Sequence, residues 1–103
     1  PILVVVPDPE LRRAIEQTLT AAGYGVRLRD TAAEAEDAAR LAPRCACAIV
    51  ATALPDGAAH DLQRALRATQ RDLPLIVVAD PTDAHGVVRA WRDGAVDVVL
   101  APV

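Results

Sequence analysis

Short apolar segments recur along the chain and alternate with segments of helical periodicity. The apolar segments are residues 2–6, 46–51, 75–79 and 96–100. Residues 46–51 and 75–79 are apolar throughout, which is typical of parallel strands covered on both faces. Strands that alternate with helices through short turns form a parallel sheet between two layers of helices. The pattern therefore predicts a three-layer, doubly wound α/β fold.

A fifth strand is predicted at residues 24–29, where Tyr24, Val26 and Leu28 alternate with glycine and arginine. Alternation of this kind indicates a strand with one solvent-exposed face, so we expect this strand at an edge of a five-stranded sheet. Five strands with only four predicted helices leave part of one sheet face without a cover. We therefore expect either a fifth helix after Val103 in the intact protein or a partner on that surface.

The helices are predicted from their start and stop signals. Asp8 is placed to cap the first helix, and Gly23 to end it. Thr31 and Glu34 have the spacing of a capping box, and Asp80 stands where a cap of the last helix is expected. The expected helices span residues 9–22, residues 31–43 up to Pro43, a segment after the turn at residues 54–57, and residues 84–93 ahead of Gly94.

The third of these helices has an apolar side and a charged side. Its expected inward residues are Leu62, Ala65 and Leu66, and its expected outward residues are Arg64, Arg67 and Gln70. An amphipathic helix of this kind covers a sheet with its apolar side.

Composition excludes several classes of function. The chain has 103 residues, which suits one domain spanning residues 1–103. Its net charge of −3 comes without a basic run, so we expect no direct nucleic-acid binding. No apolar stretch reaches the roughly 20 residues that span a bilayer, so we expect no membrane segment. We expect a cytoplasmic protein in which Cys45 and Cys47 share one strand face as small hydrophobic residues.

The C-terminal ends of the predicted strands are the most informative positions. In an open α/β sheet, ligands bind just beyond these ends. The nearby acidic residues Asp8, Asp56 and Asp80 are each assigned to a helix cap or a turn. The strand ends themselves carry Val6, Pro7, Ala51, Ala79 and Ala101. The sequence therefore predicts no catalytic residue, no metal site, no cofactor and no enzymatic activity.

Several short motifs stand in a recognisable order. They are Ile2-Leu3-Val4-Val5 followed by Asp8-Pro9-Glu10-Leu11, the turn Leu54-Pro55-Asp56-Gly57, Leu73-Pro74-Leu75-Ile76-Val77-Val78, and Gly94-Ala95 leading to Pro102. In this order and spacing the chain resembles the receiver domain of two-component response regulators, over residues 2–102. The resemblance implies a flavodoxin-like sheet with strand order 2-1-3-4-5, in agreement with the pattern above.

The resemblance also implies a role for each strand end. Active receivers bind Mg²⁺ and phosphorylate an aspartate. The acidic pair that holds the metal corresponds to Val6 and Pro7, and the phosphoacceptor to Ala51. The hydroxyl that helps the transfer corresponds to Ala79, and the lysine to Ala101. Because all five are apolar, we expect a degenerate receiver that is not phosphorylated on aspartate.

In receivers the fourth helix and fifth strand contribute to the output surface. The resemblance places Val87, Trp91 and Val98 on this surface, and large aromatic residues are enriched at binding hot spots. We expect it to bind a protein partner or a second copy as a homodimer, and to regulate a covalently linked output domain such as a DNA-binding domain. Packing of Trp91 on the sheet is the structural alternative.

A second function is compatible with the same residues. The apolar strand ends could hold a small molecule, with Thr52, Thr82 and Asp80 supplying polar contacts. The chain would then be a small-molecule sensor and not an interaction module.

Overall fold

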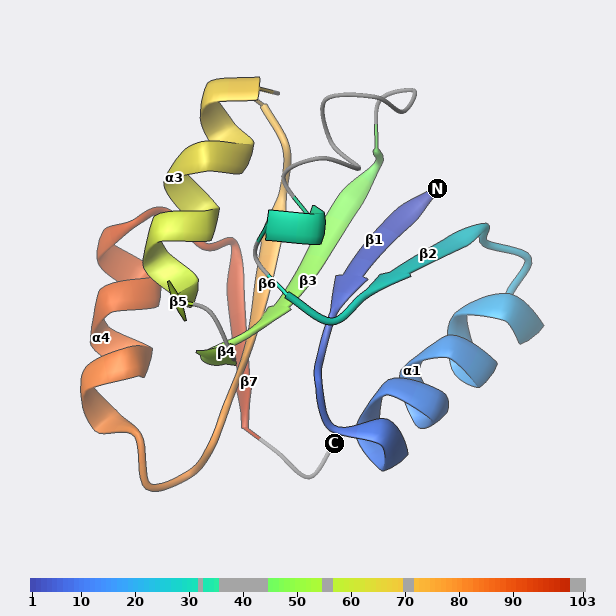
Figure 1. Ribbon diagram of the computed structural model, residues 1–103, viewed down its shortest axis with the longest axis horizontal. Coiled ribbons are helices and arrows are strands. Elements are labelled where there is room, and N and C mark those ends of the chain that lie inside the picture. Colours follow the sequence, from blue (N-terminus) through green and yellow to red (C-terminus); the bar gives the residue numbers. More distant parts are fainter. Residues whose placement is uncertain (32, 36–44, 55–56, 70–71, 101–103) are drawn as a thin grey trace.

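A parallel sheet of five strands forms the centre of the molecule, in the order β2-β1-β3-β6-β7 (Figure 1). The computed structural model describes residues 1–31, 33–35, 45–54, 57–69 and 72–100. The strands are β1 (Ile2–Val5), β2 (Val26–Arg29), β3 (Cys47–Ala51), β6 (Leu75–Ala79) and β7 (Asp97–Leu100). This arrangement confirms the predicted doubly wound fold, with strand order 2-1-3-4-5 counted over the five strands of this sheet. Val6, Ala46 and Val96 lie just outside the strands that were predicted to contain them.

The position of each strand follows from its sequence. All four residues of β1 are buried, and β1 pairs with β2 on one side and β3 on the other. The alternating segment Val26–Arg29 is only half-buried and lies at one edge, as predicted. β7, in which Asp97 interrupts the apolar pattern, forms the other edge. Apolar strands thus occupy the centre, and the two strands with charged residues occupy the edges.

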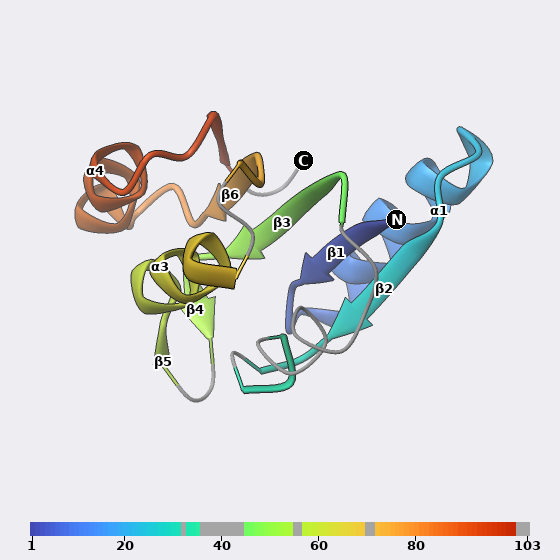
Figure 2. The same cartoon turned by 90° about the horizontal axis from the view of Figure 1, so that it is seen from above.

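Helices lie on both faces of the sheet (Figure 2). They are α1 (Pro9–Ala21), α3 (Ala59–Thr69) and α4 (Ala84–Arg92). On one face, α1 packs through Leu11, Ile15 and Leu19 against Val4 and its neighbours. On the other face, Leu62 and Leu66 of α3 are buried in a cluster that includes residues of β1, β3 and β6, and Ala90 of α4 packs on Val77. On the α1 face no described helix lies over β7 (Figure 2).

The predicted second helix is described only at residues 33–35, which are helical. The amide of Glu34 donates to Thr31 Oγ1 at 3.1 Å, which confirms the predicted cap. The predicted end at Pro43 lies outside the described residues. A turn was predicted at residues 54–57, of which residues 55 and 56 lie outside the described part of the chain. Ala53–Leu54 and Gly57–Ala58 form a small antiparallel pair, β4 and β5, which the sequence did not predict.

The two cysteines do not share a face, contrary to the prediction. Cys45 belongs to the cluster beneath α3, whereas Cys47 packs against the cluster beneath α1. The extended backbone of β3 begins at Cys47, so strand alternation does not reach back to Cys45. Burial raises the pKa of the Cys47 thiol, and the neighbouring Cys45 adds to the rise.

The joint between α3 and α4 is more polar than expected. Gln63 is only 1% exposed, and its side-chain Nε2 has no hydrogen-bond partner among the described residues. Arg67, predicted to face solvent, is half-buried and donates from Nη2 to Gly94 O at 2.5 Å. Gly94 follows α4 with φ +89°, a left-handed conformation that suits glycine. Arg67 thereby ties the end of α3 to the turn that leads into β7.

Replacement of Gln63 by leucine is expected to stabilise the protein. Leucine has a similar volume and carries no amide nitrogen. A buried polar group without a hydrogen-bond partner lowers the unfolding free energy by about 1–3 kcal/mol. Urea unfolding should therefore give a higher unfolding free energy for Gln63→Leu than for the wild type. The same change at the exposed Gln17 of α1 is the matched control and should stay within about 0.5 kcal/mol. A loss of stability in Gln63→Leu would contradict this account.

Candidate functional site: an apolar strand-end rim

The C-terminal ends of the central strands form an apolar rim, defined here by Val6, Ala51 and Ala79. Val6 and Ala79 are fully buried, and Ala51 is half-buried. β3 and β6 run side by side, with Ala51 opposite Val78, and the amide of Thr52 continues the ladder to Val78 O at 2.9 Å. None of the three rim side chains carries an oxygen or nitrogen atom. Ala101, predicted to complete this set, lies outside the described residues.

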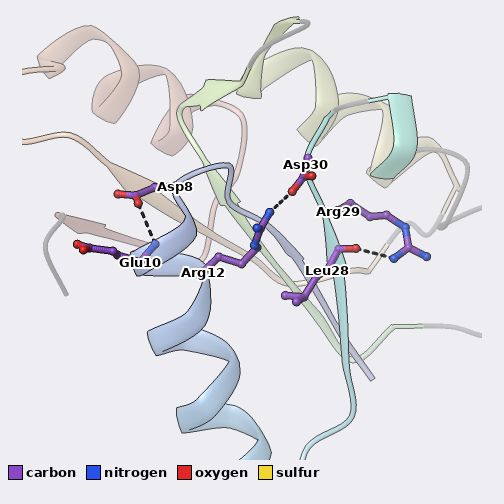
Figure 3. Close-up of polar contacts among 6 residues, drawn as sticks. All are labelled: Asp8, Glu10, Arg12, Leu28, Arg29 and Asp30. Carbon is purple, nitrogen blue, oxygen red and sulfur yellow. Dashed lines mark hydrogen bonds and ion pairs between the residues drawn. The ribbon is translucent and has the colours of Figure 1, made fainter.

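Pro7 and Asp8 connect this rim to α1. Pro7 is half-buried, whereas Asp8 is exposed and precedes the helix. The Asp8 carboxylate accepts a hydrogen bond from the amide of Glu10 at 3.1 Å (Figure 3). This contact satisfies an amide of the first turn that has no partner within the helix. Asp8 is therefore a helix cap, as predicted.

The sequence analysis did not identify a second carboxylate near the rim. Asp30, directly after β2, forms an ion pair with Arg12 of α1 (Figure 3). Arg12 is also held by the backbone, because its amide donates to Asp8 O at 2.9 Å. The alternation of residues 24–29 predicts a strand that ends near Asp30, but it does not identify a partner on α1. The pair ties α1 to the edge strand and engages the Asp30 carboxylate.

Asp80 follows β6 and does not cap α4, which corrects the prediction. Its Oδ1 accepts from Thr82 twice, at 2.8 Å from the amide and 2.6 Å from the hydroxyl. The hydroxyl contact, and then the amide contact, lower the pKa of Asp80 below its ordinary value. The lowered pKa makes a contribution to stability that is present above the ordinary value and is lost as the pH falls through the folded-state pKa. Asp80 and Thr82 therefore form a local turn on the exposed surface.

The cap of α4 is Asp83, three residues farther on. Its Oδ1 accepts from the amide of Gly86 at 2.8 Å. A side chain at position 86 would collide with the Asp83 carboxylate, so glycine leaves room for this cap. Both Asp80 and Asp83 are compatible with a helix start, and the sequence pattern alone did not separate them.

The donor set at the rim does not fit Mg²⁺. That ion requires oxygen ligands in near-octahedral geometry, and Val6, Ala51 and Ala79 supply none from their side chains. The carboxylates of Asp8, Asp30 and Asp80 are each engaged with a neighbour, as described above. Within the described ranges, no group of three or more His, Cys, Asp and Glu side chains is placed to hold a metal ion. Asp56 lies outside the described residues.

Two surface grooves lined by described residues run along α1. One, of about 220 Å³, is lined by Leu11, Ala14, Ile15, Thr18 and Leu19. The other, of about 310 Å³, is lined by Pro9, Glu10, Arg13, Ala14 and Gln17. Neither lining includes a rim residue, nor Thr52, Thr82 or Asp80. The residues predicted to orient a small ligand are thus not gathered in either groove.

Exposed apolar side chains gather on α4 and at β7. In the part of the chain that the structure describes, the large hydrophobic residues that are exposed are Tyr24 and four residues that we call the α4–β7 patch. The patch consists of Val88, Trp91, Val96 and Leu100, whose exposed fractions run from 49% to 58%.

Of the three residues predicted on this surface, Trp91 is 51% exposed and Val87 is half-buried. Val98 is half-buried and packs against the cluster of Val77, Ala90 and Ala95. The sequence prediction missed Val88, Val96 and Leu100, because periodicity alone does not tell which apolar residues stay uncovered. Half of Trp91 remains available for contact with another molecule.

Comparison with profiles of known protein families finds no match. Two curated proteins align with 98% of the chain, and both are named C4-dicarboxylate transport transcriptional regulatory protein DctD. The protein from Pseudomonas aeruginosa is 32% identical over 101 residues, and that from Rhizobium meliloti is 35% identical over 101 residues. The chain spans 22% of the length of each.

Among solved structures, a response regulator receiver protein from Pseudomonas putida is 31% identical. It superposes with a TM-score of 0.88, and the alignment covers 99% of this chain and 85% of that one. None of the described helices is long and apolar enough to cross a membrane.

Proposed function

Because this chain belongs to the response-regulator receiver family, we propose that it is a two-component signalling module that works without aspartyl phosphorylation and acts by protein–protein contact. The observation that carries the proposal is the rim. The family resemblance places the metal-binding acids, the acceptor and the hydroxyl on Val6, Pro7, Ala51 and Ala79, and these residues offer no side-chain oxygen. Phosphoryl transfer depends on a metal and on charged groups to stabilise the transferred group, and the rim lacks both kinds of residue.

The apolar rim also favours a single conformation. A cluster of carboxylates repels itself until a cation or a phosphoryl group changes its charge. Buried Val6 and Ala79 have no such charge to neutralise, so nothing at the rim distinguishes two states electrostatically. The module is therefore constitutive, and its output depends on which surface another protein covers.

The α4–β7 patch is the surface that we assign to this contact. Val88 and Trp91 lie on α4, Leu100 lies on β7 and Val96 directly precedes that strand. Half-buried Val87 and Val98 lie on α4 and β7. Fully desolvated aromatic residues dominate the energetics of protein interfaces, which makes Trp91 the central residue. Neither groove described above is lined by a rim residue, so neither supports the alternative role of a small-molecule sensor at the rim.

The setting of the module is inferred from its relatives. Both curated relatives are named transcriptional regulators, and the chain spans 22% of each. We place this receiver in a longer cytoplasmic regulator, where it controls a covalently linked output domain such as a DNA-binding domain.

The absence of phosphorylation is tested by adding Mg²⁺ with beryllofluoride, which mimics an aspartyl phosphate. The amide NMR spectrum is expected to remain unchanged, because no rim side chain can ligate the metal. Mg²⁺ alone and fluoride alone are the controls. Saturable shifts at Ala51 and Ala79 that require both beryllium and Mg²⁺ would overturn the proposal.

A further inference from the structure

The joint between α3 and α4, which lie side by side (Figure 1), contains buried polar atoms that have no partner. Over the described residues, the buried side-chain nitrogen and oxygen atoms without a hydrogen bond are Gln63 Nε2, Arg67 Nε and Asp93 Oδ2. Gln63 and Arg67 lie one turn apart on α3, and Asp93 is the C-terminal cap residue of α4. An unpaired polar atom in a protein interior lowers the stability of the packing that contains it. The described packing therefore leaves the polar groups of this joint incompletely satisfied.

The Arg67 guanidinium lies against Gly94. A Cβ atom added at Gly94 would lie 3.3–3.4 Å from Cζ, Nη1 and Nη2 of Arg67, so the group covers one face of this glycine. Nη2 donates to Gly94 O at 2.5 Å, whereas the buried Nε donates to no described acceptor. Gly94 itself is exposed. Water can therefore bond to its carbonyl whenever the guanidinium moves away.

Asp93 provides a second acceptor next to this contact. Its Cα atom is about 3.8 Å from that of Gly94, because the two residues are consecutive. The long Arg67 side chain can span that distance by rotation about its own bonds. The backbone of Asp93 is fixed by the bond from its amide to Arg89 O at 2.8 Å. Its carboxylate therefore stays beside the guanidinium, and Oδ2 is buried and unpaired there.

We propose that Arg67 is a two-position latch. In the described position, Nη2 bonds to the carbonyl of Gly94. In the second position, Nε and Nη2 donate side by side to the carboxylate of Asp93, which satisfies Arg67 Nε and Asp93 Oδ2 in one bidentate ion pair. The desolvation of a buried ion pair offsets much of its attraction, so the two positions are close in free energy and both are populated.

The two helices joined by the latch are packed unequally. Leu62 and Leu66 of α3 are fully buried. Of the residues of α4, only Ala90 is buried, and it packs in a small cluster with Val77. Segments with few buried apolar contacts move at the lowest cost in free energy. When Arg67 changes position, α4 and the turn that follows it therefore adjust, whereas α3 stays in place.

The latch lies between two residues of the α4–β7 patch. Trp91 precedes Asp93 by two positions, and Val96 follows Gly94 by two. A change at the latch alters the orientation of Trp91 relative to Val96, so a protein that covers the patch binds the two positions with different affinity and selects one of them. This step rests on the proposed function, because it takes the patch as the contact surface. The selection is made by binding, since the rim offers no charge that could trigger it.

NMR relaxation dispersion on the full chain tests the latch, because it detects exchange on the microsecond-to-millisecond timescale. In the wild type we expect exchange at the amides of Gly94 and Ala95 and at the indole N–H of Trp91. Asp93→Asn keeps the size of the side chain but removes the charge that attracts the guanidinium. It should lower the population of the second position about fivefold or more, and the dispersion should fall with it. Asp97→Asn, at an exposed carboxylate of β7, is the matched control and should leave the dispersion unchanged.

Gly94→Ala is expected to shift the latch in the opposite direction. The added Cβ crowds the guanidinium in its described position, so the second position should gain population about fivefold. The Arg67 Nε–H should then exchange more slowly with solvent, because it is held by a carboxylate. Combination with Asp93→Asn should abolish this slowing. Gly23→Ala is the control for backbone strain, since a Cβ there meets nothing within 4 Å.

The latch and the proposed function can fail separately. Dispersion at Gly94 that persists unchanged in Asp93→Asn, or its absence from both the wild type and Gly94→Ala, would show that the latch is wrong. Dispersion at Gly94 without any at Trp91 would contradict its link to the patch. Each of these results leaves the phosphorylation-independent role intact. Saturable beryllofluoride shifts at Ala51 and Ala79 would instead overturn that role, and they would not affect the evidence for the latch.

Discussion

Replacing Val6 with aspartate is expected to lower the unfolding free energy by about 3 kcal/mol or more at pH 7. Val6 is fully buried in the cluster with Ile2 and Val4 beneath α1. Losing a buried valine costs about 1.5–3 kcal/mol, and an unpaired carboxylate in the same place adds a desolvation penalty. The unfolding free energy of a small domain is only about 5–15 kcal/mol, so the loss should be easy to measure by urea unfolding.

The cost of this substitution should depend on pH in a defined direction. Burial raises the pKa of an introduced carboxyl in the folded state above its value in the unfolded chain. The folded state then holds a proton that the unfolded state has released, so stability falls as the pH rises between the two values. Val6→Asn is the matched control, because it is polar but does not titrate. The unfolding free energies of Val6→Asp and Val6→Asn should differ strongly at pH 7 and become similar toward pH 4.

A different outcome would change the view of the rim. If Val6→Asp is as stable as the wild type and its stability rises on addition of Mg²⁺, the strand ends can accommodate an acidic site. The expected result is that a single acid is costly here because the described residues of the cluster around Val6 are apolar.

Gly94→Ala is expected to cost about 2–3 kcal/mol, more than the same change at Gly23. Both glycines have positive φ, 89° and 92°, and a side chain in that conformation costs roughly 1–2 kcal/mol. A Cβ at Gly23 would meet nothing within 4 Å, so Gly23→Ala measures the backbone strain alone. At Gly94 a Cβ would lie 3.3 Å from the Arg67 guanidinium, which must then move slightly and strain its hydrogen bond to Gly94 O.

Thermal unfolding can resolve the difference between the two alanine variants. One kcal/mol corresponds to about 4–8 °C in Tm for a domain of this size. Arg67→Ala completes a double-mutant cycle. In the Arg67→Ala background, Gly94→Ala should lower the unfolding free energy by no more than Gly23→Ala does. Equal losses at the two glycines in the wild-type background would show that Arg67 does not restrain the turn.

The sheet could be predicted from sequence because burial on two faces and burial on one face leave different patterns. The apolar run of residues 75–79 and the alternation of residues 24–29 identified a central and an edge strand. The joint between α3 and α4 could not be predicted in the same way. Arg67 and Gln63 are polar residues on an amphipathic helix, and only tertiary packing determines that they are covered.

The sequence predicted the apolar chemistry of the candidate site, but not which neighbouring side chains contact one another. The apolar character of Val6, Ala51 and Ala79 is a property of the sequence, and the structure adds their burial. Asp80 and Asp83 both stand at a turn before a helix, and local spacing does not decide between them. The choice depends on Gly86, which gives the Asp83 carboxylate room to reach its amide. Asp30 and Arg12 are 18 positions apart, so their pairing depends on the fold.

The Arg29 side chain on the Leu28 carbonyl has a consequence for how far an assembly could grow. Extension of a sheet from molecule to molecule into a fibre requires two receptive sides on every subunit. At the β2 edge, the Arg29 guanidinium occupies the Leu28 carbonyl, so this acceptor is not available to a strand of another molecule. A strand added at this edge would have to displace that hydrogen bond, which opposes growth of a filament through β2.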